Sequence, residues 1–345
     1  MQNVETIKYD HLEPFYHVPD ARLSEGLTYI KESDTLLWVD IFKGEIHRLD
    51  DVTTKGTSQH DQFVATKSNY LKDAEIKYPD SDLHESVGCI FPVLGKDGKI
   101  DSVLFGGKHG VGHCKFSTKK WEYIALYSSC PELKDHAIDL RSNDGNVGPD
   151  GTKLYVGVMP DFHVKMAPIG AYVTVDLMHK PHKVEMFVNH INIPNAIHWD
   201  KTNTKIHWTD SLNHAIVKIE NGQSSKFINI KNETNAQYPS PEPDGSCIDL
   251  TNNTIYICVW SARKIQKYSL TDGRLLTQYL IPEGTPRPSS CCFVGRDLIV
   301  TTANEDIEHG KAGDHTGGCL YRIPDILPEG VDVGSAKRQP IVTNL

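Results

Sequence analysis

The stretch RSNDGNVGPDGTKLYVGVM, residues 141–159, contains the pattern on which the fold prediction rests. Its β-rich run KLYVGVM (153–159) follows a polar turn, PDGTK (149–153), which separates it from a preceding segment of the same kind. Two such runs joined by a turn that contains Gly and Asp are typical of a β-hairpin. The run GAYVTVD (170–176) adds a third strand. We therefore predict an antiparallel sheet for this part of the chain.

The same order of strand, polar turn and strand recurs along the chain. The second strand of each unit supplies an equivalent position: Leu37, Val103, Leu154, Ile206, Ile255 and Leu298. Successive positions are 66, 51, 52, 49 and 43 residues apart. A period of about fifty residues is too long for a helical solenoid and is typical of propeller blades. We therefore predict an all-β fold, a six-bladed β-propeller with four-stranded blades.

Two segments depart from this repeat. The segment YHVPDARL (16–23) precedes the first complete unit and is compatible with β structure. We expect an N-terminal strand from it to complete the sixth blade and close the ring, which removes a free sheet edge. The longest spacing is the first, and its excess falls in the polar residues 51–85. We predict that this stretch is an insertion on one rim and that residues 1–345 form a single propeller domain.

Charge and composition narrow the classes of partner. The net charge is −9, which argues against nucleic acid and anionic membranes, since both require a basic surface. The chain starts without a basic and apolar leader, and its eight cysteines show no CxxC spacing. We expect a cytoplasmic protein with reduced, mostly buried thiols that is monomeric or weakly homo-oligomeric.

Polar residues recur where the first strand of a blade begins. Asn143, Asn195 and Asp244 each lie 11 residues before the equivalent position of their unit, and Glu25 lies 12 before its own. Radial repetition would bring them to one mouth, where two carboxylates repel each other unless a cation lies among them. Oxygen ligands suit a hard divalent ion such as Ca²⁺, Mg²⁺ or Mn²⁺. Each residue alone is typical of a turn, so the predicted site rests on their common register.

The repeat units resemble the gluconolactonase/regucalcin (senescence marker protein) family from about residue 20 to residue 330. The resemblance is carried by SEGLTY (24–29), LLWVDI (36–41), GEIHRLD (44–50), RSNDGNVGPDGTKLYVGVM (141–159), IPNAIHWD (193–200), TDSLNHAIVKIE (209–220), PDGSCIDL (243–250), CVWSARKIQKY (258–268), SCCFVGRDLIVTTA (290–303) and TGGCLYRI (316–323). This family consists of six-bladed propellers, which agrees with the period of the repeat.

The resemblance implies roles for individual residues. The metal ligands of the family fall on Glu25, Asn195 and Asp244. Its substrate-binding arginine and asparagine fall on Arg141 and Asn143. Asp244 also matches the residue that accepts and donates the proton, so it is the candidate catalytic residue.

The resemblance therefore implies a metal-dependent lactonase that hydrolyses sugar lactones, such as aldonolactones, to aldonic acids. It would use one divalent cation, with Ca²⁺ preferred over Mg²⁺, Mn²⁺ or Zn²⁺. An acidic substrate contact of some members falls near Asp161, one residue out of register, and the loop MPDFHVKMAPIG (159–170) departs from the family pattern. Both leave the identity of the lactone open.

Two other functions stay open at this point. One is a non-enzymatic propeller that binds calcium or a protein, and the other is hydrolysis of other esters. The fold alone does not separate them, because propellers support both enzymes and binding modules.

Overall fold

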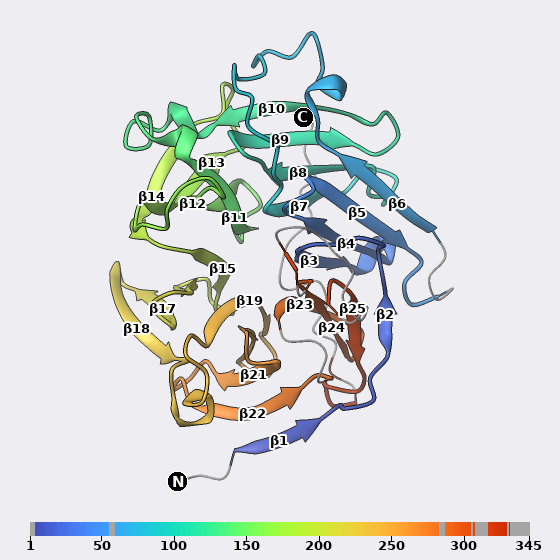
Figure 1. Ribbon diagram of the computed structural model, residues 1–345, viewed down its shortest axis with the longest axis vertical. Coiled ribbons are helices and arrows are strands. Elements are labelled where there is room, and N and C mark those ends of the chain that lie inside the picture. Colours follow the sequence, from blue (N-terminus) through green and yellow to red (C-terminus); the bar gives the residue numbers. More distant parts are fainter. Residues whose placement is uncertain are drawn as a thin grey trace. The chain divides into compact units, whose positions relative to one another are not determined.

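The computed structural model describes residues 4–54, 59–282, 287–304, 306–307, 317–329 and 331. Regular structure in these residues is almost entirely β, interrupted by short 3₁₀ turns and without an α-helix. The strands form six sheets (Figure 1), and in each sheet the inner, second and third strands follow one another in the chain. These sheets are the blades of a six-bladed β-propeller, as predicted.

The strands of the first three blades are as follows. Blade one contains β3 (Ser24–Ile30), β4 (Thr35–Asp40), β5 (Glu45–Asp50) and β6 (Gln59–Val64). Blade two contains β7 (Cys89–Val93), β8 (Ser102–Gly106), β9 (Gly110–Lys115) and β10 (Lys120–Leu126). Blade three contains β11 (Leu140–Val147), β12 (Lys153–Pro160), β13 (Gly170–Asp176) and β14 (Val184–Ile191).

The last three blades follow the same order. Blade four contains β15 (Pro194–Trp199), β16 (Lys205–Asp210), β17 (Ala215–Glu220) and β18 (Gln223–Asn229). Blade five contains β19 (Glu242–Asp249), β20 (Thr254–Trp260), β21 (Lys264–Ser269) and β22 (Leu275–Leu280). Blade six contains β23 (Pro288–Val294), β24 (Asp297–Thr302) and β25 (Leu320–Ile323).

The N-terminal segment supplies strands to two blades. Strand β2 (Pro14–Tyr16) pairs antiparallel with β25 and becomes the outer strand of blade six. This confirms the prediction that an N-terminal strand completes this blade, but the strand lies mostly before the predicted segment 16–23 and shares only Tyr16 with it. Strand β1 (Glu5–Lys8) pairs in parallel with β22 and makes the sheet of blade five five-stranded. The sequence did not predict β1, because a short, exposed polar segment carries no strand pattern.

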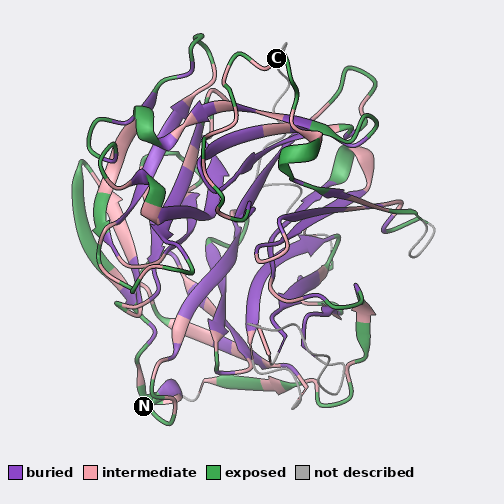
Figure 2. Ribbon diagram, turned by 45° about the horizontal axis from the view of Figure 1, so that its top comes forward, coloured by how far each residue is buried: buried purple, intermediate pink, exposed green. Residues whose placement is uncertain are grey.

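Burial decreases from the inner to the outer strand of a blade (Figure 2). Every residue of the inner strands β3 and β11 is buried, whereas most of the outer strand β18 is exposed. The apolar side chains of neighbouring blades pack against each other; one such core joins blades two and three through residues such as Phe91, Leu104, Val156 and Val173. The inner strands also carry many buried polar side chains, and their presence in the interior needs an explanation.

The chain divides into two compact units. One comprises Met1–Tyr29 and Asn195–Lys337, and the other comprises Ile30–Pro194 and Arg338–Leu345. The first contains the core between blades five and six and the core between blades four and five. The second contains the core between blades two and three.

The polar stretch 51–85 is partly regular structure. Residues 59–64 form β6, the outer strand of blade one, and residues 55–58 lie outside the described residues. Farther on, the N–H of Leu71 donates to the carbonyl of Trp121 at 2.8 Å, and the indole of Trp121 donates to the carbonyl of Thr66 at 2.9 Å. The stretch thus covers the outer strand of blade two. That it is a rim insertion within a single domain stays a prediction.

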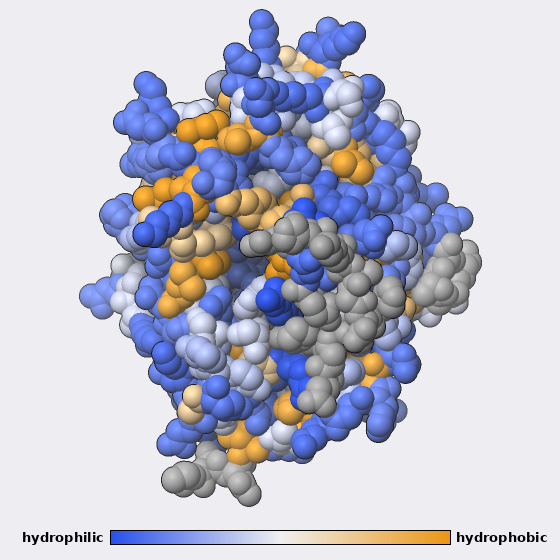
Figure 3. Space-filling view, in the orientation of Figure 1, coloured by the Kyte–Doolittle hydropathy of each residue, from blue (hydrophilic) through white to orange (hydrophobic). Residues whose placement is uncertain are grey.

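The thiols and the surface agree with the composition. All eight cysteines are free and buried, as expected. The face of the molecule in Figure 3 is mainly hydrophilic, with apolar side chains in separate groups. Over the described residues, helices long and apolar enough to cross a membrane are absent.

Candidate functional site

The predicted ligands lie on inner strands, as the repeat register requires. Glu25 is the second residue of β3, Asn195 the second of β15 and Asp244 the third of β19. Their side chains are almost fully buried, with 6%, 2% and 8% of the residue surface exposed. All three belong to the unit of Met1–Tyr29 and Asn195–Lys337.

β-Bulges occur at the polar positions of several inner strands. The pairing of β11 with β12 shifts between Ser142 and Gly145, and that of β19 with β20 shifts between Pro243 and Ser246. The shifted residues include two predicted site residues, Asn143 and Asp244. A bulge redirects a side chain that regular pleating would point into the blade. The bulges therefore provide a backbone reason for polar residues at these positions.

Close approach of neighbouring inner strands requires the glycine after Asp244. A Cβ on Gly245 would lie 2.7 Å from the hydroxyl of Ser290 and 2.8 Å from the carbonyl of Ser289. Any larger residue would push blade five away from blade six. The PDGSCIDL motif thus combines a buried carboxylate with tight packing between the two blades.

The structure brings Asn195 and Asp244 into direct contact. The carboxamide nitrogen of Asn195 donates a hydrogen bond to Oδ1 of Asp244 and another, at 3.4 Å, to the hydroxyl of Ser211. Residues 49 positions apart thus meet because they start the inner strands of successive blades. Glu25 accepts the backbone N–H of Gly26 at 3.0 Å. Its strand is tied to blade six by the Ser289 hydroxyl, which donates to the carbonyl of Ser24.

Arg141 and Asn143 form a second group, in the unit of Ile30–Pro194. Nη1 of Arg141 donates to Oδ1 of Asn143 at 3.2 Å and to the carbonyl of Ser142 at 2.8 Å. The amide nitrogen of Asn143 donates to the carbonyl of Pro194 at 3.0 Å. The orientation of the Asn143 carboxamide is therefore set by partners on both sides. The predicted substrate-binding pair lies together.

Asp161 lies beside this pair, despite its shifted register in the sequence. Its Oδ1 is 4.0 Å from Nε of Arg141, and its Oδ2 is 2.9 Å from Nζ of Lys108. Lys108 is fully buried and also donates to the carbonyls of Ile138 and Leu140, each at 2.6 Å. Burial lowers the pKa of Lys108, and the neighbouring carboxylate of Asp161 opposes that shift. Sequence reasoning missed Lys108; a lysine in GGKHG (106–110), directly after a buried strand, was the available signal.

Two aromatic side chains accompany Arg141. The ring of Phe162 lies over the guanidinium, 4.4 Å from Cζ, and stacks on Phe42 with ring centroids 4.0 Å apart. Phe162 is nevertheless 47% exposed. Cationic, acidic and aromatic groups therefore lie side by side here. Sequence analysis did not single out either phenylalanine.

A buried carboxylate, Glu85, organises the polar residues behind Lys108. It accepts the hydroxyls of Tyr78, at 2.8 Å, and Tyr123, and the backbone N–H of Lys108 at 2.9 Å. Burial raises the pKa of the Glu85 carboxyl, although these hydrogen bonds act in the opposite direction. Burial and the charge of Lys108 lower the pKa of His109 to about 4. His109 is therefore neutral at physiological pH.

The donor set on the inner strands fits a hard cation. Glu25 and Asp244 supply carboxylate oxygens and Asn195 a carboxamide oxygen, the ligand types that Ca²⁺ and Mg²⁺ take. To bind an ion, the Asn195 amide must present its oxygen in place of the nitrogen that now faces Asp244. Among the residues described, three His, Cys, Asp or Glu side chains do not converge as metal ligands. A cation here would thus depend on Asn195 as its third ligand.

Comparisons with known proteins agree with the fold and the motifs. The model of the SMP-30/Gluconolactonase/LRE-like region matches residues 23–304. The uncharacterized protein YBR053C of Saccharomyces cerevisiae is 49% identical and covers 98% of both chains.

Two solved structures share the fold. The calcium-binding protein regucalcin from Agrobacterium tumefaciens aligns over 94% of this chain and 96% of its own, with a TM-score of 0.70 and 18% identity. A gluconolactonase from Xanthomonas campestris aligns over 90% and 88%, with a TM-score of 0.58 and 14% identity. The family model matches residues 23–304, which is most of the chain, and the repeat and the inner-strand motifs agree with this match. The chain therefore belongs to the SMP-30/gluconolactonase/LRE-like family.

Proposed function

We propose that the protein is a divalent-metal-dependent lactonase that hydrolyses sugar lactones to aldonic acids. The observation that carries the proposal is the contact between Asn195 and Asp244 at equivalent positions of successive blades. A buried carboxylate beside a carboxamide, which can turn its oxygen toward an ion, suits a cation far better than it suits an apolar core. The family model, which includes gluconolactonases, supports the same chemistry.

Glu25, Asn195 and Asp244 would hold the cation, with Ca²⁺ preferred and Mg²⁺, Mn²⁺ or Zn²⁺ as alternatives. When bound, such an ion polarises a lactone carbonyl and stabilises the negative charge that develops on its oxygen. The ion would be coordinated by oxygen atoms only, without a histidine or cysteine ligand, and hard cations prefer such oxygen ligands.

Asp244 is the proposed catalytic base and acid. It takes a proton from the attacking water as the bond from water oxygen to carbonyl carbon forms. It then returns the proton to the ring oxygen as the bond from carbonyl carbon to ring oxygen breaks, so the product is a hydroxy acid. The buried position of Asp244, with 8% exposed, keeps its carboxylate away from bulk solvent.

Arg141 and Asn143 are the proposed substrate-binding residues. Both are buried polar groups with donors or acceptors in fixed positions, and such groups favour a ligand that supplies partners in return. A sugar lactone of five or six carbons has a hydroxyl on most of its carbons. Asp161, whose Oδ1 is 4.0 Å from Nε of Arg141, would orient the guanidinium by charge attraction.

A panel of lactones and metal ions tests this proposal. The protein is first freed of metal ions with a chelator. Acid release is then measured with four substrates, before and after addition of each divalent ion: the six-carbon glucono-δ-lactone, an aldonolactone of five carbons, γ-butyrolactone, and an aryl ester. We expect turnover of the sugar lactones only with an ion, and kcat/KM above that of the aryl ester. Calcium binding without turnover of any lactone would favour a non-enzymatic propeller that binds calcium; the regucalcin from Agrobacterium tumefaciens is likewise a calcium-binding protein.

A further inference from the structure

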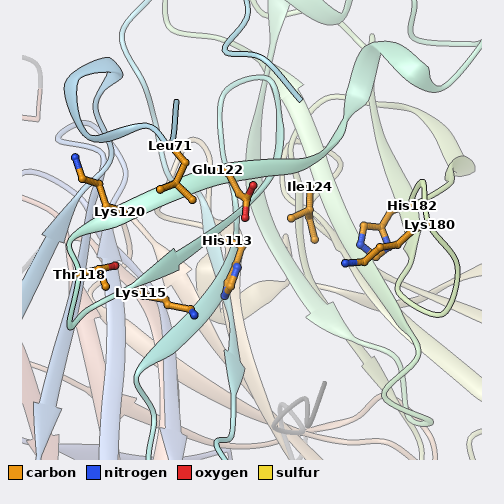
Figure 4. A pocket seen from close by; sticks show the side chains of 9 residues that line it. All are labelled: Leu71, His113, Lys115, Thr118, Lys120, Glu122, Ile124, Lys180 and His182. Atoms are coloured by element: carbon orange, nitrogen blue, oxygen red, sulfur yellow. The ribbon is translucent and has the colours of Figure 1, made fainter. Parts of the chain in front are cut away.

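A pocket outside the predicted catalytic residues lies on the outer part of blade two. It has a volume of about 350 Å³ and lies between strands β9 and β10 and the connection that joins β13 to β14. Figure 4 shows His113 and Lys115 of β9 on one side and Lys180 and His182 of that connection on the other. All of these residues belong to the unit of Ile30–Pro194.

The charge of this pocket is opposite to that of the chain. Three lysines, Lys115, Lys120 and Lys180, line it together with a single acidic residue, Glu122. The whole chain, in contrast, has a net charge of −9. A second hollow of about 210 Å³ adjoins it and shares His113 and Lys115, but it adds two lysines and two aspartates, so the excess of positive charge belongs to the first pocket. A local excess of ammonium groups in a concave site attracts anions and concentrates them there.

Two imidazoles line the pocket in addition to the lysines. Nε2 of His113 is buried and has no hydrogen-bond partner among the described residues. Nδ1 of His182 lies 2.9 Å from the carbonyl of Asp176, which assigns its hydrogen to that bond and fixes the ring. Burial, and to a lesser extent Lys115 and Lys180, lower the pKa of His113 to about 4, and an anion would offset the contribution of the two lysines. An anion in the pocket would stabilise the imidazolium form of His113, whose Nε2–H then donates a hydrogen bond to it.

We propose that this pocket binds the phosphate group of a small phosphorylated molecule. Pockets that bind small ligands measure roughly 300–1,000 Å³, so its volume of about 350 Å³ suits a ligand of monosaccharide size. A dianion interacts with several ammonium groups at once, which a single carboxylate does less well. The ligand is a phosphate ester or free phosphate rather than a nucleic acid, because the acidic chain repels a long polyanion.

Calorimetric titration of the full-length protein at constant ionic strength tests the proposal. The titrants are glucose 6-phosphate, inorganic phosphate and glucose. We expect glucose 6-phosphate to bind at one site per chain and glucose to give no signal. Lys115→Gln and Lys180→Gln should each weaken binding about fivefold, the loss expected for one screened charge pair. The matched control is Lys201→Gln, an exposed lysine in a turn of blade four, which should leave the affinity unchanged.

A second readout places the ligand. In NMR spectra with labelled histidine, the pKa of His113 should rise when phosphate binds, because the anion stabilises the imidazolium. Equal affinity for inorganic phosphate and glucose 6-phosphate would identify free phosphate as the source of the group. The proposal is overturned if glucose 6-phosphate binds no better than glucose, or if both lysine variants, folded as judged by circular dichroism, bind like the Lys201→Gln control.

Discussion

Replacing Lys108 with methionine should destabilise the fold by about 3–5 kcal/mol, the cost of removing one partner of a buried ion pair. Lys108 is fully buried, and its ammonium group is 2.9 Å from Asp161 and 2.6 Å from each of two carbonyls. Methionine has a similar volume, so the loss comes from the uncompensated carboxylate and the carbonyls rather than from a cavity. Since domains are stable by roughly 5–15 kcal/mol, this single change should move the protein close to its folding threshold.

Urea unfolding followed by tryptophan fluorescence and circular dichroism measures this cost. Lys165→Met is the matched control, because Lys165 is an exposed lysine in the loop that contains Asp161. It should change the free energy of unfolding by less than about 0.5 kcal/mol. The double variant Lys108→Met/Asp161→Leu should regain part of the loss, because it removes the carboxylate that Lys108→Met leaves without its ammonium partner. A loss below about 1 kcal/mol for Lys108→Met, or a double variant no more stable than the single one, would refute the reasoning.

Three further predictions concern pH, the N-terminus and the substrate. Burial raises the pKa of Glu85, so the folded state retains a proton that the unfolded chain releases, and stability should fall as pH rises from about 4 through the folded pKa. Glu85→Gln should flatten this slope of Tm against pH, and an unchanged slope would exclude Glu85 as its source. Deleting residues 1–17 removes β1 and β2, exposes the edge of β25 and should lower Tm or cause aggregation. Deleting residues 1–12 spares β2 and should lower Tm less. Equal Tm values for the two deletion variants and the unmodified protein would contradict this prediction. Arg141→Ala should reduce kcat/KM for an aldonolactone about tenfold more than for γ-butyrolactone, which has no hydroxyls to lose; equal losses for both lactones would speak against hydroxyl recognition by Arg141.

The blade pattern could be predicted from the sequence because each blade repeats one local arrangement. A strand, a polar turn and a second strand are short-range features, and their period of about fifty residues identifies the architecture without any long-range contact. The same register located Asn195 and Asp244, which hydrogen bond in the structure. In a repeat fold, residues at equivalent positions of neighbouring blades lie close together, so a contact between residues far apart in the sequence can be predicted from the repeat.

The surroundings of Arg141 could not be predicted in the same way. Lys108 contacts Asp161, Phe162 lies over Arg141, and Phe42 stacks on Phe162. Each follows the second strand of its own blade, but the residue type at this place differs from blade to blade. Their contacts depend on how individual loops pack, which a repeat does not encode. Strand β1 escaped prediction for a related reason, since its pairing with β22 uses backbone groups and no apolar pattern.

The kinetic constants of Asp244→Asn test the central claim most directly. Asparagine keeps the shape of the side chain and one acceptor oxygen but removes the charge and the proton acceptor. We predict that kcat/KM for glucono-δ-lactone, measured with saturating Ca²⁺, falls by about a thousandfold or more. The matched control Asp272→Asn, at an exposed turn between β21 and β22, should retain full activity. An Asp244→Asn protein as active as this control would contradict the account.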